Sequence, residues 1–81
     1  MNENIITDPY AEAADLIARL QAVGRQADAE VLQDAIDSGS TGTEIFMALR
    51  WHLEDLLKKG LPDDLRKRAA RLEAFLAAAL R

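Results

Sequence analysis

The sequence has 81 residues, enough for a single domain with one modest hydrophobic core. It contains no cysteine, which excludes disulfides and thiolate metal sites, and no apolar run of about 18 residues, so we expect no membrane span. The net charge of −4 disfavours general affinity for nucleic acids. The first residues also lack the positive charge and long apolar run of a secretory signal, which predicts a cytoplasmic location.

The charge is distributed unevenly between the two halves of the chain. Residues 1–40 contain eight acidic side chains and two arginines, a balance of −6, whereas residues 41–81 contain six acidic and eight basic side chains, a balance of +2. We expect the halves to pack with these charges in register, which would bring Arg66, Arg68 or Arg71 close to carboxylates of the first half. The alternative is that the acidic half binds a basic partner.

Residues 1–7 are predicted to be a flexible tail, and the first helix is predicted over residues 9–23. Asp8 suits the N-cap, and Pro9 suits the first helical position because its missing N–H and fixed φ cost nothing there. Gly24 is predicted to end the helix. The apolar residues recur on one side, as packing on a core requires. They are Tyr10, Ala13, Leu16, Ile17, Leu20 and Val23.

A second helix is predicted over residues 26–38, with Gly39 after its end. Its apolar face is predicted to consist of Val31, Leu32, Ala35 and Ile36. Only Gly24 and one or two further residues separate this helix from the first. The two helices must therefore fold back on each other as a hairpin.

The third predicted helix, residues 42–59, has the clearest limits. Thr41 and Glu44 have the spacing of a capping box, in which the Thr hydroxyl accepts from the N–H of Glu44 and the Glu carboxylate accepts from the N–H of Thr41. Gly60 is predicted to end the helix in the left-handed conformation. The residues expected to face the core recur with a period of about 3.6. They are Ile45, Phe46, Leu49, Leu53, Leu56 and Leu57.

The fourth helix is predicted over residues 62–80, with Pro62 at its first position and two aspartates at the positive end of the helix dipole. Its apolar stripe consists of Leu65, Ala69, Leu72, Phe75, Leu76, Ala79 and Leu80. Together the four helices predict an all-α domain over residues 8–81. Its architecture is a small four-helix bundle or an irregular four-helix array built from two helical hairpins.

The sequence offers little for catalysis or for metal binding. His52 is the only histidine, and the spacing adds at most Asp55 as a second ligand, whereas zinc needs three or four. The serines and threonines fall in predicted caps, so no set of nucleophile, base and orienting group can be assembled. The loop over residues 39–43 could cradle an anion, but Glu44 would repel a phosphate, and a turn with a cap explains the loop better. We therefore predict a non-enzyme with no metal and no cofactor.

Met47 and Trp51 are the most informative pair for function. At about 100° per residue, both fall opposite the centre of the predicted core face of the third helix. Trp51 could be covered there, either because neighbouring helices touch this helix on both sides or because Ile5 and Ile6 fold over it. Otherwise it forms a surface for a partner or for a second copy, since Trp and Met are enriched at interfaces.

The leading functional hypothesis is a small acidic cytoplasmic protein–protein interaction module, a regulator or an inhibitor-type binding protein. Its partner would be another protein, with a homodimer as the second option. The alternative is a nucleic-acid-associated regulator that uses the basic part of the fourth helix. The candidate interface residues for these hypotheses are Met47, Trp51, Arg66, Arg68 and Arg71.

Overall fold

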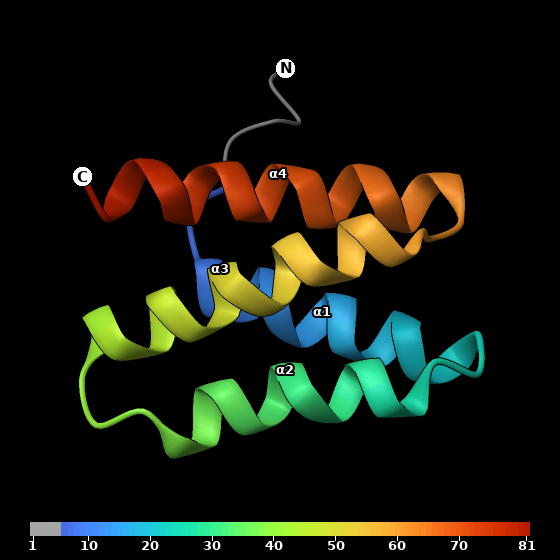
Figure 1. The fold of residues 1–81 in the computed structure, drawn as a ribbon, viewed down its shortest axis with the longest axis horizontal. Coiled ribbons are helices and arrows are strands. Elements are labelled where there is room, and N and C mark those ends of the chain that lie inside the picture. Colours follow the sequence, from blue (N-terminus) through green and yellow to red (C-terminus); the bar gives the residue numbers. More distant parts are fainter. Residues whose placement is uncertain (1–5) are drawn as a thin grey trace.

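The computed structural model describes residues 6–81, which form four helices with no strand among them. The helices are α1 (Pro9–Ala22), α2 (Gln26–Ser38), α3 (Gly42–Lys59) and α4 (Asp63–Ala79). Their ends differ from the expected ends by at most one residue. Figure 1 shows that α1 and α2 form one antiparallel hairpin and that α3 and α4 form the other. The chain is therefore an all-α protein, as predicted.

Each helix packs against two neighbours, so the four helices follow one another in cyclic order around a single core. α1 contacts α2 and α4, and α3 contacts the same two helices. The α1–α2 and α3–α4 turns lie at one end of the molecule, and the α2–α3 connection lies at the other (Figure 1). The buried residues of the core are Ile6, Ala13, Leu16, Ile17, Leu20, Ala29, Leu32, Ala35, Leu49, Leu53, Leu56, Leu65, Ala69, Leu72 and Leu76.

Side-chain caps begin α1 and α3. The Asp8 carboxylate accepts from two N–H groups of the first turn of α1, at 3.1 and 3.2 Å. The Thr41 hydroxyl accepts from the N–H of Glu44 at 3.1 Å, which confirms the predicted cap of α3. The Glu44 carboxylate, however, accepts from the N–H of Ser40 at 2.9 Å rather than from that of Thr41. The second bond of the capping box thus reaches one residue further back and fastens the α2–α3 connection to α3.

Glycines with positive φ follow α1 and α3. Gly24 has a φ of +81° and Gly60 has a φ of +95°, values that residues with a Cβ rarely adopt. Pro62 differs from the prediction, because its ψ of 150° is extended and makes it the N-cap of α4 instead of its first helical residue. The helix therefore begins with Asp63 and Asp64, whose carboxylates lie at the positive end of the helix dipole.

The burial of several apolar residues differs from the prediction. Tyr10, Val23 and Val31 were expected on core faces but are exposed, because they lie at helix ends or at the margin of a face that the neighbouring helices leave uncovered. Most of the predicted tail, residues 1–7, lies outside the described residues. Within it, Ile6 is buried and belongs to the core.

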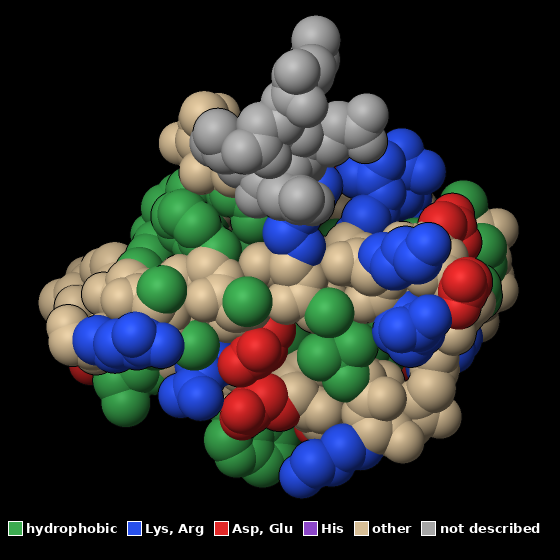
Figure 2. Space-filling model, turned by 90° about the horizontal axis from the view of Figure 1, so that it is seen from above, with side chains coloured by type: hydrophobic (Ala, Val, Ile, Leu, Met, Phe, Trp, Pro, Cys, Tyr) green, Lys and Arg blue, Asp and Glu red, His purple; other side chains and the backbone are tan. Residues whose placement is uncertain are grey.

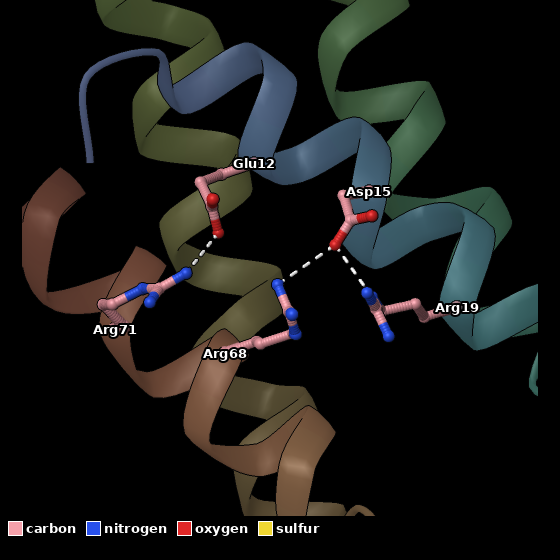
Figure 3. Close-up of polar contacts among 5 residues, drawn as sticks. All are labelled: Glu12, Asp15, Arg19, Arg68 and Arg71. Carbon is pink, nitrogen blue, oxygen red and sulfur yellow. Dashed lines mark hydrogen bonds and ion pairs between the residues drawn. The ribbon is translucent and has the colours of Figure 1, made fainter. Parts of the chain in front are cut away.

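Ion pairs between α1 and α4 confirm that the two oppositely charged halves meet (Figure 3). Arg68 donates to Asp15 at 3.1 Å, and Arg71 donates to Glu12 at 2.8 Å. Asp15 also accepts from Arg19 of its own helix at 2.8 Å. The earlier acidic residue of α1 pairs with the later arginine of α4, so these contacts specify an antiparallel register of the two helices.

A second polar cluster joins the two turns at the opposite end of α1. Asp28 accepts from Arg25 at 2.8 Å and from Lys59 at 3.3 Å. Arg25 also donates to the carbonyl of Gly60 at 3.2 Å. Burial raises the pKa of Asp28, but the hydrogen bonds from Arg25 and Lys59 outweigh burial, and the net pKa is lowered. The hydrogen bond to Asp28 in turn raises the pKa of Lys59.

Candidate interaction surface

α3 turns its leucines inward and its tryptophan outward. Leu53 is fully buried, whereas Trp51 keeps 64% of its surface exposed and Met47 keeps 58%. These are the two most exposed large apolar side chains of the described residues. The prediction that Met47 and Trp51 point away from the core is therefore confirmed.

Neither of the two coverings considered for Trp51 is seen among residues 6–81. α3 packs against α2 and α4 on its inner side, and its outer side keeps Trp51 exposed, so α3 is not a central helix enclosed by its neighbours. Ile6 is itself buried in the core, and Ile5 lies outside the described residues. Trp51 is therefore a surface residue, which requires an explanation because a large aromatic side chain exposed to water loses the free energy that its burial would supply.

A shallow depression with a volume of about 190 Å³ lies beside Trp51, between α3 and the end of α4. We refer to it as the Trp51 hollow. Three of its lining residues are apolar and two are charged: Met47, Trp51 and Leu80, and Arg50 and Glu54. Sequence reasoning identified two of these five residues.

The residues that sequence reasoning missed come from the packing of α3 against α4. Ala79 and Leu80 were both predicted to lie on the core stripe of α4. Ala79 is exposed instead. Leu80 follows the last helical residue and lines the hollow. Both lie at the C-terminal end of the stripe, where the core no longer covers them. The sequence contained one signal for Arg50 and Glu54. They are four residues apart, so they lie on the same side of the helix, and Trp51 stands between them in the sequence.

The two charged lining residues of the hollow take part in ion pairs. Arg50 donates to Glu73 of α4 at 3.1 Å and lies 3.5 Å from Glu54 of its own helix. The pair of Arg50 with Glu54 is exposed on both sides, and exposed pairs contribute little to stability. Their consequence is geometric, because the guanidinium of Arg50 is paired with two carboxylates and the hollow presents both signs of charge.

The ring of His52 lies against that of Trp51. The two rings meet edge to face, with centroids 5.2 Å apart and an interplanar angle of 87°. His52 is half-buried, so its ring gives the exposed indole a fixed neighbour. Within residues 6–81, no three side chains of His, Asp or Glu gather in a way that could hold a metal ion.

The three arginines of the predicted interface lie apart from the Trp51 hollow and are engaged in ion pairs. Arg68 and Arg71 face α1, as described above, and Arg66 donates to Asp63 of its own helix at 2.6 Å. Figure 2 looks down on α4 and shows that most basic side chains of this face gather at the right of the view, with acidic ones among them. The candidate residues thus separate into an apolar group on α3 and a charge-paired group on α4.

No protein-family model, curated protein or solved structure matches this chain. None of the helices in the described part of the chain is both long enough and apolar enough to cross a membrane.

Proposed function

We propose that this protein is a small cytoplasmic protein–protein interaction module, a regulator or inhibitor-type binding protein, that docks on its partner through the Trp51 hollow. The observation that carries this proposal is the exposure of Trp51 and Met47 side by side on the outer face of α3. Trp and Met are enriched in the cores of interfaces, and tryptophan is prominent among the side chains that dominate binding energy.

The surroundings of Trp51 suit an interface anchor. The indole has few rotatable bonds and rests against His52, so little conformational entropy is lost when a partner covers it. The charges of Arg50 and Glu54 accompany the apolar lining residues, and interfaces likewise combine an apolar core with a polar rim. We propose no catalysis, because the Thr41 hydroxyl is committed to a helix cap and the only histidine lies against Trp51.

The test compares two variants that each remove one exposed apolar side chain. Tagged Trp51→Ala and Val23→Ala proteins are used as baits beside the wild type in cells of the source organism, and the captured proteins are identified by mass spectrometry. Val23 is the matched control, because it is 51% exposed at the far end of α1 and outside the hollow. We expect Trp51→Ala to lose a captured protein that Val23→Ala retains. Capture of the same proteins by all three baits would contradict the proposal.

The alternative, a nucleic-acid-associated regulator that uses Arg66, Arg68 and Arg71, has weaker support. Each of these arginines already has a carboxylate partner, and phosphate binding would have to compete with these pairs. A salt titration of binding to random-sequence DNA tests the alternative. Micromolar affinity that falls steeply with salt would favour it, whereas no binding at low salt would remove it.

A further inference from the structure

The outer face of α3 has a charge pattern that is complementary to itself. Glu44 lies seven residues before Trp51 and Lys58 lies seven residues after it. Seven residues are close to two helical turns, so both side chains project within about 20° of the Trp51 direction. Both are exposed. When two such helices lie antiparallel with their Trp51 residues facing each other, Glu44 of each copy comes opposite Lys58 of the other.

The two charges at the ends of this face are available for such a pairing. Lys58 forms no ion pair among the residues that the structure describes, whereas its neighbour Lys59 is engaged by Asp28 and Asp55. Glu44 uses one carboxylate oxygen to accept from the N–H of Ser40, which leaves its second oxygen as an acceptor. The pattern therefore presents one acid and one base at equal distances on either side of an exposed tryptophan.

The middle of the face fits the same arrangement. Met47, Arg50 and Glu54 lie on one flank of Trp51, and Leu80 borders that flank from α4. A two-fold axis beside Trp51 places this flank of one copy against the same flank of the other. Arg50 of each copy then lies near Glu54 of the other, and the two indoles cover each other and the apolar lining residues of the hollow.

We propose that the partner of the Trp51 hollow is a second copy of this chain, bound antiparallel through α3 with a two-fold axis beside Trp51. The inference rests on the proposed function, because it names the occupant of the same surface. A two-fold interface is isologous, which means that both copies contribute the same patch. One self-complementary patch is therefore sufficient, and the assembly is complete with two copies.

A charge exchange tests the inference by sedimentation equilibrium, with the wild type measured from about 10 μM to about 1 mM protein. We expect the wild type to form dimers. Glu44→Lys alone and Lys58→Glu alone should each weaken dimerisation by about tenfold or more, because both end pairs become repulsive. An equimolar mixture of the two variants should recover dimers close to wild-type strength, because every Lys at 44 then meets a Glu at 58. Trp51→Ala should be monomeric.

Two controls separate association from folding. Lys67→Glu reverses an exposed charge on α4, outside the hollow, and should dimerise like the wild type. Glu44→Lys also loses a cap bond, so its helicity is checked by circular dichroism. Where it does not fold, Glu44→Cys and Lys58→Cys are mixed under oxidation, and the chain has no other cysteine. We expect a disulfide between the two variants and almost none within either variant alone.

A wild type that stays monomeric at the highest concentration, or variants that show no recovery on mixing, would overturn the second copy as partner. The bait experiment then decides the wider proposal. A different protein captured in a Trp51-dependent manner leaves the proposed function standing with another partner. Absence of any Trp51-dependent capture, together with a monomeric wild type, overturns both.

Discussion

Replacing Asp28 by Asn tests the polar cluster that joins the two turns. Asn keeps the shape of the side chain and removes the charge that Arg25 and Lys59 bind. A hydrogen bond to a charged group contributes about 1.5–3 kcal/mol to stability. Lys59 is 54% exposed, so solvent screens its interaction with Asp28. We therefore ascribe the loss of stability to the interaction with Arg25 alone. We expect Asp28→Asn to lower the free energy of unfolding by about 1.5 kcal/mol at pH 7, at the low end of that range.

The pH dependence of this effect provides the sharper test. The pKa of Asp28 is lowered in the folded protein, so its stabilising contribution is complete above the ordinary Asp pKa of about 3.9 and is lost as pH falls through the lowered value. Urea melts at pH 7 and at about pH 2 should therefore show a difference between wild type and variant that shrinks towards zero in acid.

Asp34→Asn is the matched control for this experiment. Asp34 lies on the same helix as Asp28, is exposed and forms no ion pair among the described residues. Its substitution should change stability by less than about 0.5 kcal/mol at either pH. The reasoning would be refuted by an Asp28→Asn effect no larger than that of the control at pH 7, or by one of the same size at both pH values.

Three further predictions concern α3 and are measured by urea melts. Thr41→Ala should lower the free energy of unfolding by about 1 kcal/mol, because it removes the hydroxyl that caps the helix. Gly60→Ala should cost about 1 kcal/mol, because Ala is strained at a φ of +95° even though its Cβ would meet no atom within 4 Å; a neutral result would contradict this helix end. Leu53→Ala should cost about 2–5 kcal/mol by leaving a cavity, whereas Trp51→Ala should cost less than about 1 kcal/mol. Equal losses would show that Trp51 contributes to the core.

The helix limits could be predicted because their signals are local. The hydroxyl of Thr41 and the N–H of Glu44 lie within one turn, so their meeting depends only on the backbone between them. The carboxylate of Glu44 has a longer reach, and its choice of the N–H of Ser40 depends on how the α2–α3 connection approaches the helix. Pro62 is a similar case, since proline suits both the N-cap and the first helical position and the path of the turn decides between them.

The interaction surface could be predicted only in part. The direction of Trp51 follows from the helix phase, but its exposure depends on which sides of α3 the other helices cover. The contribution of Leu80 depends on where the end of α4 comes to lie against α3. The uneven charge indicated that the halves would meet, yet the pairing of Arg68 with Asp15 required the register of α1 against α4. The helix limits and the hairpins were thus readable from the sequence, whereas the register between helices and the burial that follows from it were not.

The contact between α1 and α4 has a consequence for the kinetics of folding. Its ion pair between Glu12 and Arg71 spans 59 residues, whereas the other helix contacts join consecutive helices and close shorter loops. We therefore expect the α1–α4 contact to form late, after the rate-limiting step of folding. Interactions formed late slow unfolding and leave the folding rate unchanged. In stopped-flow experiments, Glu12→Gln should accelerate unfolding without slowing refolding, and slower refolding would place this contact in the folding nucleus. The pairing of α1 with α4 would then determine how long the folded state persists once it has formed.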